Sequence, residues 1–259
     1  MIIDAFIKTQ AAVLSDTIVQ LRSTITSEHI HRLRVATKKL RTVARLLGDP
    51  SVMDPVLEIY RASGTVREPE IMGGVLGVFV RDTTIDAQPL HRLLTTQRNA
   101  AIKQLKVVVA QTDDATIGRC LKKLRDLRSH FTDAEIERMI DQRIKRKRKR
   151  ACKAADALSN IDVLHAMRKD LKQVNHLMMI DENAQDMKGK HRRAIISDIE
   201  SFAGAIHDRA MLQEWLRSVP SDVISRRMRD SIITSLTKHM ETELRQMKSS
   251  LHAMCSTAS

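Results

Sequence analysis

A pattern of basic and apolar residues occurs twice in this chain, and the duplication limits what the chain can fold into. Residues 31–40 and 165–174 each begin with a histidine, place an arginine three residues later and a lysine four residues after that, and lie about 134 residues apart. A second matched pair, residues 63–68 and 203–208, follows at about 140 residues. Two ordered pairs at similar offsets predict two homologous halves, 1–132 and 133–259.

The composition favours helices throughout both halves. The 259 residues include 8 Gly and 5 Pro, with 4 Phe, 1 Trp and 1 Tyr as the aromatic residues, whereas residues that favour helices are abundant. The apolar residues recur at three- and four-residue steps between clusters that break helices. The sequence therefore predicts an all-α fold, with helices at about 1–24, 27–48, 54–80, 88–110, 115–130, 133–158, 162–180, 188–216 and 221–252.

The helix at 27–48 has two distinct faces. Its basic residues follow steps of three and four, so they share one face, and Leu33, Ala36 and Leu40 belong to a separate apolar face. This basic stripe extends over about 21 Å at the usual helical rise, which suits an extended anionic polymer better than one phosphate. A solvated surface is the alternative interpretation. The stripe consists of His31, Arg34, Lys38, Arg41 and Arg45.

The second copy repeats part of the stripe. His165, Arg168 and Lys172 have the same spacing, Lys169 lies beside them, and His176 follows one turn after Lys172. Two equivalent stripes are expected to line one shared groove.

The charge balance points to anionic partners without choosing among them. Lys and Arg number 44 against 31 for Asp and Glu, a formal charge of +13. A run of six basic residues at 145–150 points in every direction on a helix, so we interpret it as a solvated segment. No aromatic residue lies within the stripes or the run, which argues against base stacking. Nucleic acid bound through its backbone remains the alternative ligand.

No residue pattern predicts catalysis, a metal site or a cofactor. Glu68 and Asp208 are the only acids that occur in both halves, and each follows a basic residue, which suggests that they orient Arg67 and His207. His29 and His31 lie on different helix faces, so they do not form a metal site. We expect a binding protein that is not an enzyme.

Three cysteines at unrelated spacings, Cys120, Cys152 and Cys255, predict free thiols in a reducing compartment. The longest apolar stretch, 71–80, is far shorter than a membrane span, and the first residues do not form a signal peptide. The sequence thus predicts a cytoplasmic protein with no membrane partner, and it gives no oligomeric state.

These motifs resemble those of the conserved histidine α-helical domain (CHAD) family. The resemblance rests on residues 31–41 with 64–68, and on residues 165–172 with 204–208. It implies two antiparallel four-helix bundles related by pseudo-twofold symmetry, with inorganic polyphosphate bound between them. The residues expected to bind it are His31, Arg34, Lys38, Lys39, Arg41, Arg45, Arg67, His165, Arg168, Lys169 and Lys172.

The chain departs from the family pattern in both halves. Lys38 and Lys39 stand where arginine is common, and Glu68 stands where aspartate is usual, so charge is kept in the first half. In the second half Gln173, Asn175 and His176 replace a basic residue, an arginine and a tyrosine. We therefore expect the first half to make the stronger site.

Overall fold

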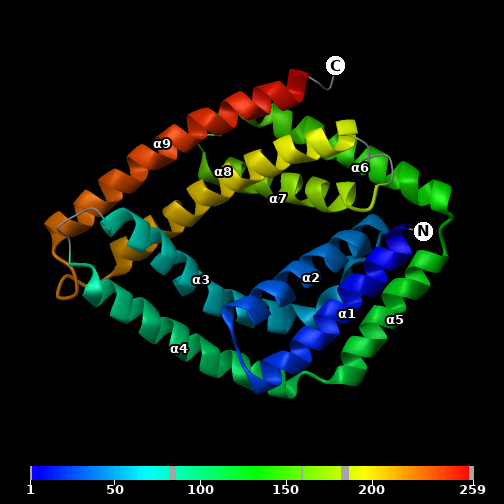
Figure 1. Cartoon of the computed structure of the whole chain (residues 1–259), viewed down its shortest axis with the longest axis horizontal. Helices are drawn as coiled ribbons and strands as arrows, with labels where there is room; N and C mark the ends of the chain where they lie inside the picture. The colour runs from blue at the N-terminus through cyan, green and yellow to red at the C-terminus, as the bar shows by residue number, and fades with distance from the viewer. Residues whose placement is uncertain (1, 82–85, 159, 182–186, 257–259) are drawn as a thin grey trace. The chain divides into compact units, whose positions relative to one another are not determined.

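The computed structural model describes residues 2–81, 86–158, 160–181 and 187–256, and these residues form helices and connecting turns without a strand (Figure 1). The predicted all-α fold is confirmed. The α-helices are α1 (Ile2–Ser23), α2 (Ser27–Leu46), α3 (Leu57–Val80), α4 (Gln88–Gln111), α5 (Asp114–Ser129), α6 (Asp133–Lys153), α7 (Ile161–Met178), α8 (Met187–Ser218) and α9 (Arg226–Ser256), and the short 3₁₀ segments are η1 (Pro50–Val56) and η2 (Ala155–Ala157).

Helix α2 begins and ends where its local sequence requires. The Thr26 hydroxyl accepts a hydrogen bond from the His29 N–H at 3.1 Å and so caps the first turn. After Leu47, Gly48 has a φ of 96°, a left-handed conformation that glycine adopts without steric cost. Pro50 then starts η1, because its ring fixes a suitable φ for a helical first residue.

Other helix ends differ from the sequence prediction by a few residues. Helix α9 begins at Arg226 rather than near 221, because the Ser225 hydroxyl caps it by accepting from the Met228 N–H at 3.3 Å. The helix predicted at 133–158 ends at Lys153 and is followed by η2. Most of the predicted breaks at 83–88 and 181–183 lies outside the described residues.

The chain forms two compact units, each assembled from separate segments. Unit 1 consists of Met1–Arg67, Arg98–Arg146 and His176–Gly189, and unit 2 consists of Glu68–Gln97, Lys147–Asn175 and Lys190–Ser259. Helix α2 therefore belongs to unit 1, and most of α7 and α8 belongs to unit 2. The two halves predicted from the sequence are defined by its duplication, whereas these units are defined by compactness. The boundary between the halves and their pseudo-twofold symmetry therefore remain predictions.

The core of unit 1 lies where α1, α2, α5 and η1 pack together. The apolar stripe of α2 supplies Leu33, Ala36 and Leu40, none of which is exposed to solvent. Helix α1 packs against α2, and its Leu14 and Ile18 are buried as well. Burying one such leucine contributes roughly 2 kcal/mol. The basic stripe is thereby held on the side of α2 that this core does not use.

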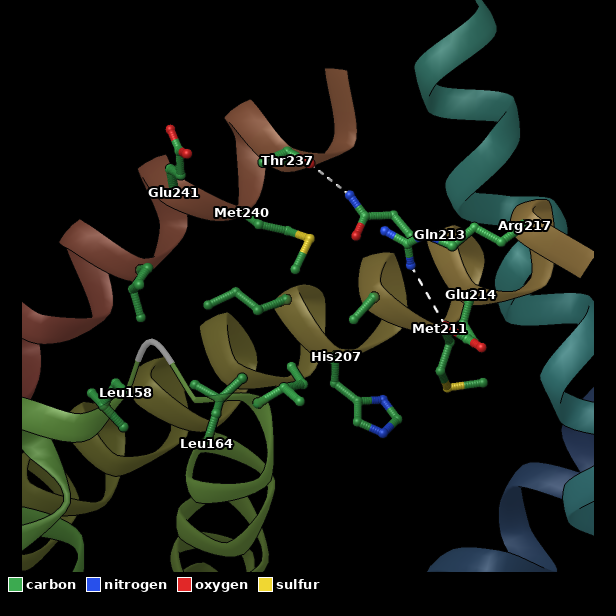
Figure 2. A pocket seen from close by; sticks show the side chains of 14 residues that line it. Leu158, Leu164, His207, Met211, Gln213, Glu214, Arg217, Thr237, Met240 and Glu241 are labelled. Carbon is green, nitrogen blue, oxygen red and sulfur yellow. Dashed lines mark hydrogen bonds and ion pairs between the residues drawn. The ribbon is translucent and has the colours of Figure 1, made fainter. Parts of the chain in front are cut away.

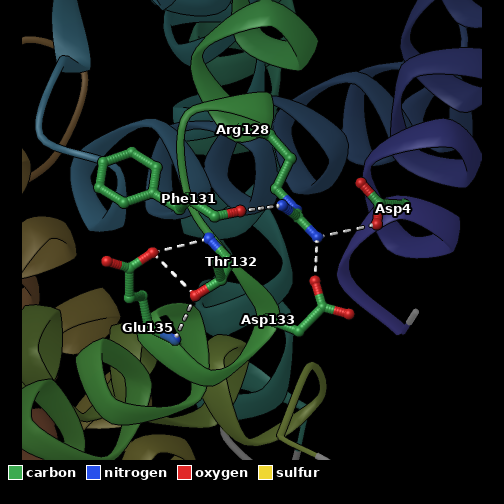
Figure 3. Close-up of polar contacts among 6 residues, drawn as sticks. All are labelled: Asp4, Arg128, Phe131, Thr132, Asp133 and Glu135. Atoms are coloured by element: carbon green, nitrogen blue, oxygen red, sulfur yellow. Dashed lines mark hydrogen bonds and ion pairs between the residues drawn. The ribbon is translucent and has the colours of Figure 1, made fainter.

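The turn between α5 and α6 is fixed by a polar network (Figure 3). Arg128 donates to the Phe131 carbonyl at 2.7 Å and pairs with Asp133 at 2.6 Å and with Asp4 of α1 at 3.2 Å. Thr132 and Glu135 form a reciprocal capping box, in which the carboxylate accepts from the Thr132 N–H at 2.7 Å and the threonine hydroxyl accepts from the Glu135 N–H at 3.3 Å. These contacts set where α6 starts in unit 1.

Unit 2 has its own apolar core and a covalent tie. The core is formed by the last turns of α3, the first turns of α4, the last turns of α8 and the first turns of α9. Cys152 of α6 and Cys255 of α9 form a disulfide, with 5.9 Å between their Cα atoms. The prediction of three free thiols is wrong for this pair, because folding brings together residues 103 positions apart. Cys120 is buried and free, and burial raises its thiol pKa to about 11.

Ion pairs between helices also hold unit 2 together. Lys147 and Asp170 are both buried, with Nζ 2.6 Å from Oδ1, and Arg150 adds a second contact to the same carboxylate at 3.2 Å. The 145–150 run points in several directions, as expected, but it is not merely solvated, because one of its lysines is in the core. None of the described helices is both long and apolar enough to cross a membrane.

Candidate basic anion-binding site

The basic stripe of α2 is partly exposed in unit 1. His31 is exposed, and Lys38, Arg41 and Arg45 are half-buried. Lys39, one position off the stripe, lies toward α1, where its ammonium is 5.8 Å from the centre of the Phe6 ring. The structure therefore keeps most of the predicted stripe together and places Lys39 on a neighbouring side of the helix.

Arg34 connects α2 to α3. Its Nη1 donates to the Tyr60 carbonyl at 2.8 Å and to the Ser63 hydroxyl at 3.3 Å, and its guanidinium lies 4.5 Å from the centre of the Tyr60 ring. A Cβ at Gly64 would lie only 2.9 Å from Arg34 Nη1. This close approach explains why the matched motif places glycine here. Arg67, on the next turn of α3, is half-buried.

A series of arginines from three helices continues the stripe, and we call it the arginine array. Burial lowers the pKa of Arg41, and the neighbouring charge of Arg45 lowers it further. Tyr60 and Asp54 act in the opposite direction, and Arg61 adds a smaller lowering effect. The pKa of Arg143 is likewise lowered by burial first, then by Arg146 and Arg45. Each arginine thus repels the next. The array consists of Arg41, Arg45, Arg61, Arg143 and Arg146.

One buried hydrogen-bond donor of the array, the Nε of Arg41, has no partner among the described residues. A buried donor without a partner costs about 1–3 kcal/mol, and neighbouring like charges add to the cost. An anion bound at the array would offset the repulsion among these charges, and the forked guanidinium suits phosphate oxygens.

Arg143 and Arg146 were not in the site predicted from the sequence. They line a pocket of about 260 Å³ together with Leu46, Met139 and Gln142. Their three-residue spacing places them on one face of α6, and this was the available signal. The basic run at 145–150, which includes Arg146, concealed this spacing, because consecutive basic residues do not indicate which of them share a surface.

The second stripe lies on α7 of unit 2, beside α8. The rings of His165 and His207 are stacked with centroids 5.0 Å apart. Burial lowers the pKa of His165, followed by the charges of Lys169, His207 and Arg168. His165 Nδ1 and Arg168 Nε are buried without a partner among the described residues. A smaller cationic cluster with unused donors therefore lies in unit 2.

Acidic residues neutralise other members of this second stripe. Lys172 pairs with Glu200 of α8 at 3.0 Å, and Asn175 donates to the same carboxylate at 3.2 Å. Arg193 donates to the Asn175 side chain at 3.0 Å, so the amide bridges Glu200 and Arg193. His207 contacts Asp208 at 3.3 Å, which agrees with the expected orienting role of this acid. Lys172 is therefore less available to an external anion than Arg45.

A larger pocket in unit 2 has a different character (Figure 2). It has a volume of about 620 Å³ and is lined mainly by apolar side chains of α7, α8 and α9, including Leu164, Met211 and Met240. Gln213 donates to the Thr237 hydroxyl at 2.8 Å at one side of it. Its mainly apolar walls suit a polyanion less well than the basic stripe of α2 does.

The described residues contain no group of three His, Cys, Asp or Glu side chains positioned to hold a metal ion. Asp208 contacts His207, whose ring stacks on His165, and the charge of Asp162 also acts on His165. The cationic side chains of this cluster support electrostatic binding of an anion.

Comparisons with known proteins agree with the motifs. A family model described as "CHAD domain" matches residues 5–217. The crystal structure of the CHAD domain from the plant Ricinus communis is similar, with a TM-score of 0.72 and 14% sequence identity over 96% of this chain and 90% of that chain. No functionally curated protein matches the sequence. At this identity the structural similarity speaks for the fold alone.

Proposed function

This chain belongs to the CHAD domain family, and we propose that it binds inorganic polyphosphate without catalysing a reaction on it. The arginine array of unit 1 carries the proposal, because Arg41, Arg45 and Arg143 are half-buried and lie close enough for their charges to repel one another. The array extends the stripe of α2 that the sequence predicts, and it supports a ligand with regularly spaced negative charges.

The length of the basic stripe supports a polymer rather than a single anion. His31 and Arg45 lie fourteen residues apart on one continuous helix, which corresponds to about 21 Å. Arginine can bind two phosphate oxygens at once, and several such contacts along one chain add in free energy. The shared groove between two bundles that the family implies remains a prediction.

Nucleic acid is the competing ligand, and the aromatic side chains give reason to rank it second. The Tyr60 ring is covered by Arg34, and Phe6 lies beside Lys39. Sequence-tolerant binding of single strands depends on open aromatic surfaces on which bases stack. A cation already lies near each of these half-buried rings, so binding through phosphates is the better account.

The test is a titration of long-chain polyphosphate against duplex DNA of equal total charge, at about 50 mM and 200 mM salt. We expect polyphosphate to bind at least about tenfold more tightly at both salt concentrations, with affinity falling as salt increases. Lys38→Gln with Arg45→Gln should weaken binding at least about tenfold, because two charge-assisted contacts are lost. Equal or tighter binding of DNA would refute the proposal.

A matched control separates the stripe from general charge. Lys103 and Lys106 of α4 are exposed and also belong to unit 1. Lys103→Gln with Lys106→Gln removes the same charge and should change the affinity less than about threefold, as expected for screened surface charges. Release of phosphate from the polymer should stay at the level of the uncatalysed reaction. The cytoplasmic location remains a prediction from the sequence.

A further inference from the structure

The pocket beside Arg143 and Arg146 differs from the open stripe of α2. It is small, about 260 Å³, whereas pockets for drug-sized ligands begin at roughly 300 Å³. Leu46 and Met139 form an apolar part of its lining, which offers no hydrogen bonds to a polymer passing through. The pocket therefore suits a short, compact group.

The polar part of the lining fits a multiply charged anion. Arg143 and Arg146 supply positive charge, and none of the described residues that line the pocket is acidic. Arg45 of α2 adds to this charge, since it acts on Arg143. Gln142 supplies both an amide donor and a carbonyl acceptor. The acceptor matters because a terminal phosphate can carry a proton at neutral pH, whereas an internal phosphate of a chain has none to donate.

We propose that this pocket is a subsite for a compact di- or triphosphate group, either the free end of a polyphosphate chain or a short free oligophosphate. The proposal rests on the proposed function and adds a recognition element for phosphate ends. Interior phosphates bind along the stripe of α2, and the end group binds between Arg143, Arg146 and Gln142, next to Arg45. Short chains then bind mainly at the pocket, and long chains use both regions.

Tripolyphosphate is the probe for this subsite, and calorimetric titration of the full chain is the measurement. The wild-type protein should bind tripolyphosphate, and Arg143→Gln with Arg146→Gln should weaken that binding at least about tenfold. The matched control is Lys122→Gln with Arg125→Gln, which removes two exposed cations at the same three-residue spacing from α5 of unit 1. This control should stay within about twofold of the wild type.

Two further arms identify the source of the group. Long polyphosphate with free ends should lose more affinity in the Arg143→Gln, Arg146→Gln protein than the same polymer with chemically blocked ends. Equal losses for the two polymers would overturn end recognition. If the double variant unfolds, Arg146→Gln alone takes its place, because Arg146 is exposed.

The inference and the proposed function fail in different ways. Tripolyphosphate that does not bind, or that binds the double variant and its control equally, overturns the subsite while tight binding of the long polymer still supports the general function. Preference for DNA over long polyphosphate overturns the general function and the subsite with it.

Discussion

The two units use the same motif differently. In unit 1 the basic residues of α2 lie beside further arginines of α3 and α6, and their charges add. In unit 2 several basic residues of α6, α7 and α8 lie beside carboxylates, as in the pairs Lys147–Asp170, Lys172–Glu200 and Arg209–Glu243. Ion pairs and a disulfide connect the helices of unit 2. Unit 1 also has ion pairs between helices, such as Arg128–Asp4, but its arginine array lies apart from them. The number of basic residues in a motif is therefore a poor measure of its capacity to bind an anion.

The largest expected effect concerns the disulfide of unit 2. Cys152→Ser should lower the free energy of unfolding by about 4 kcal/mol, because closing a loop of about 100 residues restricts the unfolded chain. Denaturant unfolding with and without a reducing agent measures the change. Tripolyphosphate binding at the array of unit 1 should persist in the folded variant.

Reduction of the wild-type protein supplies the internal control. The reducing agent should destabilise the wild type by the same amount as the substitution and should not destabilise Cys152→Ser further. If the free energy of unfolding of the wild type stayed unchanged under reducing conditions, the disulfide would not contribute to the stability of unit 2.

The matched glycines compare how tightly each unit seats its motif arginine. An added Cβ would lie 2.9 Å from the Arg34 guanidinium at Gly64, but 3.6 Å from that of Arg168 at Gly204. Alanine favours a helix by about 1 kcal/mol over glycine. Gly204→Ala should therefore stabilise the protein by up to about 1 kcal/mol, whereas Gly64→Ala should give no gain or a loss, since displacing Arg34 costs its bonds to α3.

Denaturant unfolding of the two glycine variants measures the difference, which we expect to be about 1–2 kcal/mol. The double variant Arg34→Gln with Gly64→Ala is a control, because without the guanidinium the added methyl group should recover the helical gain. Equal effects of the two single substitutions would mean that Arg34 is seated no more tightly than Arg168.

The smallest expected effect is a pH dependence that arises in unit 2. The pKa of free His165 lies below its ordinary value of 6.5, mainly through burial and then through Lys169 and His207. A bound phosphate favours the protonated ring, so polyphosphate binding should take up protons and strengthen roughly two- to fivefold as pH falls below about 7. His165→Asn should flatten this dependence, and His130→Asn, at an exposed position of unit 1, should not.

The same shift has the opposite sign for folding. A histidine whose pKa is lowered in the folded state contributes stability above its ordinary pKa of 6.5, and this contribution is lost as pH falls, because the unfolded chain takes up the proton more readily.

Binding of polyphosphate measured by calorimetry in two buffers of different ionisation enthalpy would report the proton uptake on binding directly. The arginines of unit 1 stay charged across this range, so an equal pH dependence in His165→Asn would place its origin elsewhere.

The sequence determined the helices and their faces. Thr26 and the Gly48 turn set the ends of α2, and the three- and four-residue spacing separated Arg41 and Arg45 from the buried Leu40. These features depend on local backbone geometry and on helical periodicity, so they can be predicted without knowing the neighbours. The duplicated motif also pairs Gly64 with Gly204, and the structure gives the reason, because each glycine leaves room for an arginine side chain.

Only the tertiary structure decided which charges remain uncompensated. The charge of Arg45, on another helix, acts on Arg143, and Glu200 forms an ion pair with Lys172. Cys152 forms a disulfide with a residue 103 positions away. Helical periodicity places a side chain on a face, but the electrostatic energy of that side chain depends on what the facing helix presents within a few ångströms. The sequence thus predicted a basic, two-faced helix, and packing made one of its two copies an arginine array.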